Sequence, residues 1–241
     1  MIPLETVETD FGTINVFRRR SSGAITYEQG GCQQSEADNN GVSLASYIHA
    51  IFGLIQQSRA HKILLIGCAG GTLATMLARM DKNVTAIDVN PASFPLAKQY
   101  FSLPNSVRCK IADGKSFLRT DMQIYDAIVI DAYHGDRIPA HLKSIRFYSV
   151  VRERLSQRGA LFANIHVKHA FDRRVVRIAE CMSMVFSDVR LLDSATFLRH
   201  NAVLMAGAVK HLDLPKLVVP PAVDCQLVES ELATMKFRAW R

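Results

Sequence analysis

The stretch Lys62-Ile63-Leu64-Leu65-Ile66-Gly67-Cys68-Ala69-Gly70-Gly71-Thr72-Leu73 decides the fold. Its apolar run and glycine cluster are followed by apolar residues at helical spacing, which predicts a buried strand, a tight turn and a helix. The next apolar segment, 84–87, predicts a second strand that ends on Asp88. An acidic side chain at that strand tip can hold the hydroxyls of a ribose. The sequence therefore predicts an α/β domain that binds a nucleoside.

The spacing of the glycines indicates which nucleoside to expect. Two residues separate Gly67 from Gly70, and Gly71 follows directly, so the pattern is GxxGG and differs from the dinucleotide pattern GxGxxG. Ala69 occupies a position where a pyrophosphate would need bare backbone. We therefore favour a nucleoside without phosphates, such as an S-adenosyl sulfonium, over NAD. A plain strand-to-helix turn is the alternative without a ligand.

Length and composition fit one α/β domain with a small appendage. The chain has 241 residues, of which 49% are hydrophobic, and this is enough to bury a full core. No apolar run approaches the length of a membrane span, and the acidic start, 1–5, lacks the core of a signal peptide. We expect a cytoplasmic protein with no membrane partner.

Cysteine spacing argues against a disulfide-rich or zinc protein, and the distribution of charge argues against a nucleic-acid-binding protein. The five cysteines have no CxxC spacing, which favours reduced, mostly buried thiols over a disulfide framework or a zinc site. The net charge of +7 comes partly from 18–20 and from Arg173, Arg174 and Arg177. Because no aromatic residues interleave with these arginines, solvated faces of a hairpin and a helix are favoured over a nucleic-acid partner.

The remaining pattern predicts an organisation in three parts. Polar and apolar residues alternate at 13–17 and 24–27, which predicts a β-hairpin ahead of the nucleoside domain. An amphipathic helix is expected from Ser43 to Ile55. Further strands are expected at 107–111, 125–131, 160–165, 188–192 and 202–206, and helices at 91–101, 116–120, 141–157 and 173–185. We expect a β-hairpin region at 1–40, a catalytic domain at 41–212 and a tail at 213–241, in which 229–237 is a candidate short helix.

Glycine or acid follows four predicted parallel strands, at Gly67, Asp88, Asp113 and Asp131. Ligands collect outside the carboxyl ends of such strands, so we expect these residues to share one crevice. Asp131 continues into Ala132-Tyr133-His134-Gly135-Asp136.

Each candidate in this region also has a structural alternative. Asp131 or His134 could accept a proton from an amine nucleophile, whereas the alternatives are a turn-forming acid and a solvated loop histidine. Tyr133 could face a sulfonium by a cation-π contact or cover the sheet edge. Asp136 could contact substrate or form a surface pair with Arg137. His49 is equally compatible with a core histidine and a site residue.

Taken together, these residues resemble the spermidine-synthase family, the polyamine aminopropyltransferases. The resemblance covers roughly 27–206 and implies a Rossmann-like class I S-adenosylmethionine methyltransferase fold. That fold is a seven-stranded, mostly parallel sheet with an antiparallel last strand, here with a small N-terminal β-hairpin appendage. The most specific positions are Gln33 with Ser35 and Asp38, His49, 67–73, 88–91, Asp113-Gly114, Asp131, 139–142 and Phe147-Tyr148.

The resemblance implies roles for these positions and a donor, S-adenosylmethionine or its decarboxylated form. By likeness Asp88 holds the ribose, Asp113 lies near the adenine, Gln33 lines the donor site, and Asp131 helps to deprotonate an acceptor amine. The candidate catalytic residues are Asp131 and His134. The candidate cofactor-binding residues are Gln33, Gly67, Ala69, Gly70, Gly71, Asp88, Asp113 and Gly114, and the candidate substrate-binding residues are His49, Tyr133 and Asp136. A homodimer or higher homo-oligomer is also implied.

The sequence departs from the family pattern at positions that bind cationic groups. Ala69 stands where the family carries an acid that binds the amino group of the aminopropyl donor, and His134 stands at a second acidic position. A tyrosine of the acceptor site is replaced by Ser43 or Val42. Each lost charge-assisted bond is worth about 1.5 to 3 kcal/mol.

These departures leave the transferred group, methyl or aminopropyl, and the acceptor open. We expect a transferase that alkylates an amine or another small nucleophile. The alternatives are a catalytically degenerate nucleoside-binding scaffold and, with least support, an NAD-dependent oxidoreductase.

Overall fold

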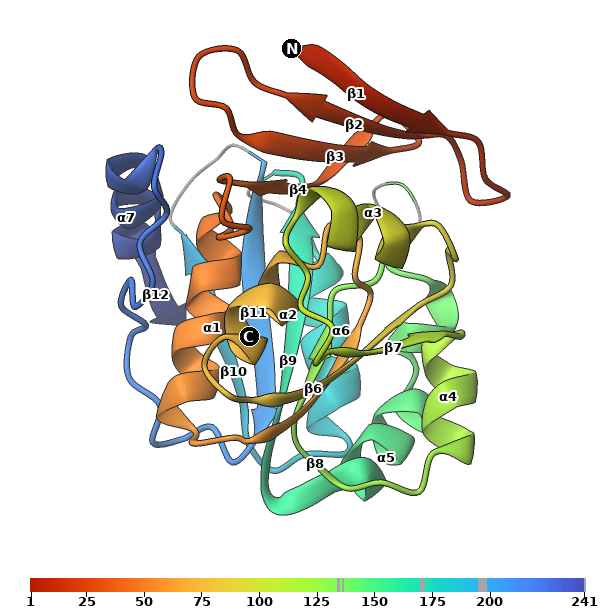
Figure 1. Cartoon of the computed structure of the whole chain (residues 1–241). Helices are drawn as coiled ribbons and strands as arrows, with labels where there is room; N and C mark the ends of the chain where they lie inside the picture. Colours follow the sequence, from red (N-terminus) through yellow and green to blue (C-terminus); the bar gives the residue numbers. More distant parts are fainter. Residues whose placement is uncertain (134, 136, 170–171, 195–198, 241) are drawn as a thin grey trace.

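The computed structural model describes residues 1–133, 135, 137–169, 172–194 and 199–240. A small antiparallel sheet lies at the top of the molecule in Figure 1, above a larger sheet that is flanked by helices. Among the helices of the described residues, none has the length and apolarity that crossing a membrane requires.

The N-terminal sheet contains the predicted hairpin and extends it on both sides. Its described strands are ordered β1-β2-β3-β4, with bounds β1 (Ile2–Val7), β2 (Ile14–Arg18), β3 (Ile25–Gln29) and β4 (Cys32–Ala37). Residues 30–31 form the turn from β3 to β4. Gly30 and Gly31 both adopt positive φ there, a conformation that suits glycine. Strand β4 was missed because its sequence, CQQSEA, has no apolar alternation.

The larger sheet confirms the predicted fold class. Within the described residues its order is β12-β10-β11-β9-β8-β5-β6-β7. The strands from β7 to β9 are mutually parallel, and β11 runs antiparallel to β9. The bounds are β5 (Lys62–Ile66), β6 (Asn83–Asp88), β7 (Arg108–Ile111), β8 (Tyr125–Ile130), β9 (Leu155–Val167), β10 (Val189–Ser194), β11 (His200–Gly207) and β12 (Met235–Arg238).

Strand β12 adds an edge strand that the sequence analysis did not predict. The candidate short helix at 229–237 is wrong in its bounds, because α7 spans Cys225–Thr234 and 235–237 belong to β12. Residues Leu191 to Ser194 of β10 pair with β12 in antiparallel register. The end of the chain is therefore part of the main sheet.

The helix expected at 141–157 is divided and ends earlier. A 3₁₀ turn, η1 (Ala140–Lys143), precedes α5 (Ile145–Arg154), and β9 already begins at Leu155. Ser144 separates the two helices, because its hydroxyl accepts a 3.2 Å hydrogen bond from the backbone N–H of Phe147 and caps α5.

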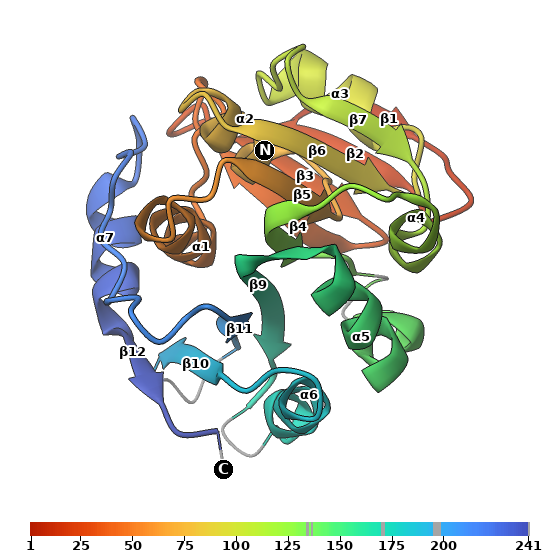
Figure 2. The ribbon, with the colours of Figure 1, turned by 90° about the horizontal axis from the view of Figure 1, so that it is seen from below.

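Helices cover both faces of the larger sheet, as Figure 2 shows. One core cluster joins the sheet to α1 (Ser46–Gln57), α2 (Thr72–Ala78), α3 (Ser93–Tyr100) and α7. The other joins it to α4 (Gly114–Thr120), α5 and α6 (Arg174–Ser183). The five cysteines are free and half-buried, which is more exposed than we expected from the sequence.

The tips of β5 and β8 meet at Gly67. This residue has φ +97°, and a Cβ placed on it would lie 2.2 Å from the carbonyl oxygen of Asp131. Only glycine fits this approach without a shift of the backbone. The glycine loop and Asp131 are thus held side by side by the sheet itself.

Candidate functional site

A cavity of about 410 Å³ lies at the carboxyl ends of the parallel strands. Gly67, Asp88, Asp113 and Asp131, which close β5, β6, β7 and β8, all line this cavity. Its volume lies in the range of small-molecule sites, about 300 to 1,000 Å³. We call it the donor cavity. The structure thus brings the predicted strand tips to one place, and their individual roles stay predictions.

Asp88 holds the glycine loop. Its Oδ2 accepts hydrogen bonds from the backbone N–H groups of Cys68 (2.9 Å) and Ala69 (3.2 Å), and its Oδ1 accepts one from Asn90 (2.8 Å). An ionised carboxylate has about four acceptor sites. Asp88 therefore retains capacity for about one further hydrogen bond, which a ribose hydroxyl can donate.

The loop amides are not arranged to bind phosphate. The N–H groups of residues 68 and 69 point to Asp88, that of Gly70 donates to Ser35 Oγ (3.1 Å), and that of Gly71 donates to the Cys68 carbonyl (2.7 Å). A phosphate cradle needs such groups aimed at the ligand. This geometry favours a nucleoside without phosphates and opposes the NAD alternative.

Asp113 lines the donor cavity as the N-cap of α4. It accepts a 2.9 Å hydrogen bond from the backbone N–H of Ser116, and its Oδ2 lies 2.7 Å from Nε2 of His141. Partial burial raises the pKa of Asp113, but the bonds from Ser116 and His141 outweigh it, so the net pKa lies below the ordinary value. Asp113 is therefore ionised at neutral pH.

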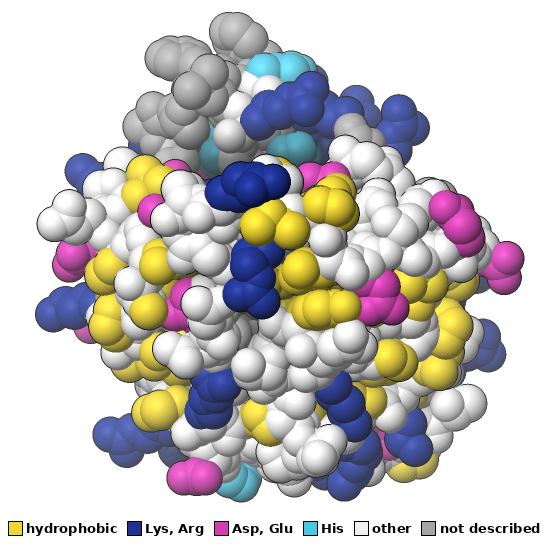
Figure 3. Space-filling model, turned by 45° about the horizontal axis from the view of Figure 1, so that its top comes forward, with side chains coloured by type: hydrophobic (Ala, Val, Ile, Leu, Met, Phe, Trp, Pro, Cys, Tyr) yellow, Lys and Arg dark blue, Asp and Glu magenta, His cyan; other side chains and the backbone are white. Residues whose placement is uncertain are grey.

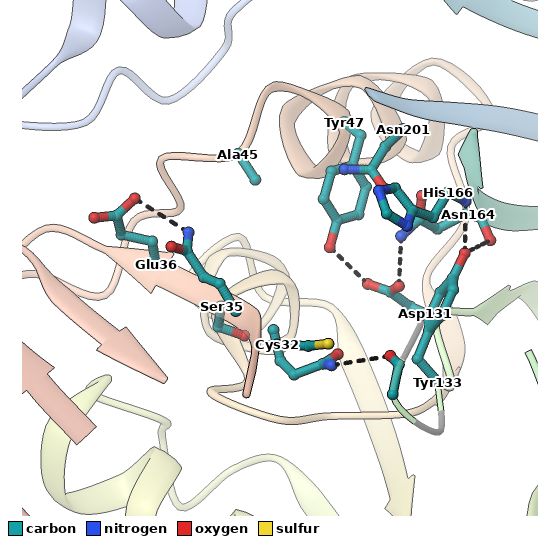
Figure 4. Close-up of a pocket in the computed structure, with 13 residues that line it drawn as sticks. Cys32, Ser35, Glu36, Ala45, Tyr47, Asp131, Tyr133, Asn164, His166 and Asn201 are labelled. Carbon is teal, nitrogen blue, oxygen red and sulfur yellow. Dashed lines mark hydrogen bonds between the residues drawn. The ribbon is translucent and has the colours of Figure 1, made fainter. Parts of the chain in front are cut away.

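Asp131 is half-buried, and two polar side chains bind it. Tyr47 on α1 donates a hydrogen bond to Oδ2 (3.1 Å), and the amide nitrogen of Asn164 on β9 donates one to Oδ1 (2.7 Å), as Figure 4 shows. Burial raises the pKa of Asp131 above its ordinary value, and these two bonds oppose the shift. A carboxylate with a raised pKa is a better proton acceptor than a solvated one.

A second cavity, of about 190 Å³, lies on the other side of Asp131. We call it the acceptor cavity. It is lined by Tyr47, Asn164, His166, Asn201 and Glu36 among others, and it shares Gln34, Asp131 and Tyr133 with the donor cavity. Among the described residues, the Oδ1 atom of Asn164 is buried without a hydrogen-bond partner.

Four of the predicted residues that the structure describes do not line the donor cavity: Gln33, His49, Gly70 and Gly71. Gln33 lines the acceptor cavity and contacts Glu36, while its neighbour Gln34 lines both cavities. His49 is buried, its Nε2 lies 2.7 Å from the carbonyl oxygen of Ser43, and it lines neither cavity. This placement matches the core-histidine alternative.

The remaining predicted residues differ in whether they line the donor cavity. Gly114, Ala69 and Tyr133 line the donor cavity, whereas Gly70 and Gly71 form the turn behind it. His134 and Asp136 lie outside the described residues.

Sequence reasoning missed Tyr47, Asn164 and His141 as site residues. Tyr47 falls on the apolar stripe of α1, a pattern that indicates a core residue, although its hydroxyl contacts Asp131. Asn164 is a lone amide in a run of apolar strand residues. A polar residue at a buried strand position is a usable signal, because such a group needs a partner.

No family model matches the chain. A probable polyamine aminopropyl transferase from Bifidobacterium longum is 27% identical over 139 residues, which is 57% of this chain. The match spans 31% of that relative's own length. A polyamine aminopropyltransferase from Neisseria meningitidis is 28% identical over 181 residues, covering 71% of this chain and 67% of the relative.

The fold is similar to that of solved spermidine synthases. The crystal structure of a probable spermidine synthase from Corynebacterium glutamicum superposes with a TM-score of 0.79 over 97% of this chain and 90% of that one, at 16% identity. The resemblance to the polyamine aminopropyltransferases that the sequence motifs indicated is thus confirmed, and the chain has the Rossmann-like fold of a spermidine synthase.

Proposed function

We propose that this protein transfers an alkyl group from an S-adenosyl sulfonium to an amine or another small nucleophile. The observation that carries the proposal is the position of Asp131, which lines both the donor cavity and the acceptor cavity. A nucleophile beside Asp131 is adjacent to the place where a sulfonium would lie. Similarity to named aminopropyltransferases supports the same reaction class.

The donor cavity suits adenosine with a sulfonium. Asp88 can accept a hydrogen bond from the ribose, and Asp113 lines the same cavity and can contact the adenine. Ala69 offers no carboxylate to the amino group of an aminopropyl chain. Both S-adenosylmethionine and its decarboxylated form are therefore proposed as donors.

The transfer is a single displacement. The nitrogen lone pair of the acceptor attacks the carbon next to sulfur, the N–C bond forms, the S–C bond breaks, and its electron pair goes to sulfur. The donor leaves as a neutral thioether, and one proton is lost from the acceptor nitrogen. Holding the nucleophile in line with the S–C bond supplies most of the rate acceleration.

Asp131 is the proposed proton acceptor. An alkylamine with a pKa of about 10.4 arrives protonated and must lose a proton before it attacks. This half-buried carboxylate can take that proton, and Tyr47 and Asn164 fix its orientation through their hydrogen bonds. Proton transfer by a positioned side chain contributes about 10²- to 10⁴-fold to a rate.

The test is turnover of either donor by Asp131→Asn. We expect the release of thioether nucleoside to fall by about 10²- to 10⁴-fold, while methylthioadenosine binds with unchanged affinity. Asp81→Asn, an exposed substitution that lines neither cavity, is the matched control and keeps full turnover. Binding of the nucleoside without turnover by any form would support the scaffold alternative and contradict the transferase.

By the same resemblance we propose that the protein is cytoplasmic and assembles as a homodimer or higher homo-oligomer. We also propose that the chain is divided into the three regions 1–40, 41–212 and 213–241. Light scattering coupled to size-exclusion chromatography tests the assembly. A monomer at micromolar concentration would contradict it.

A further inference from the structure

A third cavity, of about 370 Å³, lies beside the acceptor cavity and is rich in basic side chains. We call it the basic cavity. Among its described lining residues, Asp172 is the only carboxylate. The basic lining residues are Arg137, Lys143, Lys168 and Arg174, with His166 and His169. With both histidines neutral, this lining has an excess of three positive charges.

Asp172 is ionised, and its carboxylate is engaged within the protein. Its oxygens accept bonds from the backbone N–H groups of Lys168 (3.0 Å) and Arg174 (3.0 Å) and from the Arg174 guanidinium. Burial raises the pKa of Asp172, but these bonds outweigh it and hold the pKa far below the ordinary value. If Asp136, the neighbour of Arg137 in the sequence, is also counted, the excess is still two positive charges.

The basic cavity borders the proposed site of transfer. Tyr133 lines the donor, acceptor and basic cavities, and His166 lines the acceptor and basic cavities. The Tyr133 hydroxyl donates to the Asn164 carbonyl (2.9 Å) and accepts from the His166 N–H (2.8 Å), which fixes this shared wall. Figure 4 shows Tyr133 and His166 beside Asp131.

The acceptor cavity and the basic cavity therefore carry charges of opposite sign. Asp131 and Glu36 line the acceptor cavity, in which no lysine or arginine is among the described lining residues. The basic cavity follows directly behind Tyr133 and His166. Figure 3 shows lysine, arginine and histidine side chains gathered at the upper edge of the face in view.

We propose, building on the transfer reaction proposed above, that the acceptor is an amine that also carries an oxyanion, a carboxylate or a phosphate. Its amine lies beside Asp131, and its oxyanion binds in the basic cavity. Charge-assisted hydrogen bonds from lysine and arginine stabilise such a group. A dicationic polyamine would instead place its second ammonium against an excess of positive charge, which is unfavourable.

The first experiment compares acceptors of matched length. Wild-type protein is incubated with S-adenosylmethionine or its decarboxylated form, and with putrescine, 4-aminobutyrate or O-phosphoethanolamine. Release of the thioether nucleoside is measured by mass spectrometry. We expect kcat/KM to be at least tenfold higher for one of the anionic amines than for putrescine, and the better of the two distinguishes carboxylate from phosphate. Equal or preferred use of putrescine, or no use of either anionic amine, would overturn the proposal.

The second experiment locates the oxyanion. Lys143→Gln should raise KM for the preferred anionic amine at least fivefold with little change in kcat, and Lys143→Arg should restore KM. Lys98→Gln, exposed on α3 and absent from all three cavities, is the control. If KM is unchanged both in Lys143→Gln and in the separate variant Arg137→Gln, the anion binds elsewhere and the inference is contradicted.

A binding measurement separates the two proposals. Methylthioadenosine should bind wild-type protein and Lys143→Gln with equal affinity. If the nucleoside binds and putrescine is used but the anionic amines are not, the acceptor assignment fails and the transferase proposal stands. If the nucleoside does not bind wild-type protein, the transferase proposal itself fails.

Discussion

The hydroxyl of Tyr47 donates a 3.1 Å hydrogen bond to Oδ2 of Asp131, which links α1 to the tip of β8 at the border between the donor and acceptor cavities. This bond favours the ionised form of Asp131, whereas burial favours the protonated form and raises its pKa. The balance of the two effects sets the pH range in which Asp131 can accept a proton.

Replacing Tyr47 by Phe should move the acidic limb of the pH–rate profile to higher pH. The substitution removes a hydrogen bond that lowers the pKa of Asp131, so the carboxyl stays protonated to a higher pH and cannot take the proton of the acceptor. We expect turnover on that limb to fall by about tenfold or more, with a smaller loss on the plateau. A profile of kcat/KM against pH that matches the wild type would contradict the assigned role of Asp131.

Asp88→Asn should weaken nucleoside binding by about 10- to 100-fold. Asn has one accepting oxygen, so it cannot accept both the pair of loop bonds from Cys68 and Ala69 and the bond from Asn90 on the other side. A bond to a charged group is worth about 1.5 to 3 kcal/mol, and 1.4 kcal/mol corresponds to about tenfold in affinity. Calorimetric titration with methylthioadenosine measures the loss. Asp81→Asn is the control, and equal affinity of both variants would show that Asp88 does not support the site.

Gly67→Ala should destabilise the fold more than Gly30→Ala. Both glycines have positive φ, so both substitutions carry a cost of about 1 to 2 kcal/mol for the left-handed conformation. At Gly67 the added Cβ would also lie 2.2 Å from the Asp131 carbonyl oxygen, whereas at Gly30 nothing lies within 4 Å. We expect Gly67→Ala to lower the free energy of unfolding by about 3 kcal/mol or more, as measured by urea denaturation. Equal losses at both positions would show that β5 and β8 do not approach as described.

His49 should make unfolding dependent on pH in mildly acidic solution. Burial lowers its pKa in the folded state below the value of about 6.5 in the unfolded chain. The folded state therefore binds fewer protons, and its stability decreases as pH falls through that value toward the lowered pKa. His49→Gln keeps an amide donor for the Ser43 carbonyl and has no group that titrates there. As the pH is lowered from 7 to 5, the free energy of unfolding of this variant should rise relative to that of the wild type. A difference in free energy that stays constant with pH would contradict the burial of a neutral imidazole.

The sequence was sufficient to predict those elements that short local patterns determine. The glycine loop, the five parallel strands and the strand-tip acids were predictable, because apolar runs, turn glycines and terminal acids lie within short windows. The fold class and the convergence of Gly67, Asp88, Asp113 and Asp131 followed from parallel topology.

Other features depend on contacts between distant segments. Tyr47 and Asn164 reach Asp131 across 84 and 33 residues of sequence, and no local pattern separates a core tyrosine from one whose hydroxyl binds a carboxylate. Strand β12 is four residues long and forms against β10, so its existence depends on a tertiary partner. The basic cavity combines the segments 137–143 and 165–178, which are separate in the sequence.

The most direct test of the account is an isothermal titration of the wild-type protein with S-adenosylmethionine, its decarboxylated form, methylthioadenosine and NAD. The strand tips around the donor cavity and the engaged loop amides predict one binding site per chain for the adenosyl ligands and no heat with NAD. Binding of NAD in preference to the adenosyl ligands, or no heat with any of them, would contradict the central claim that this cavity holds an adenosyl sulfonium.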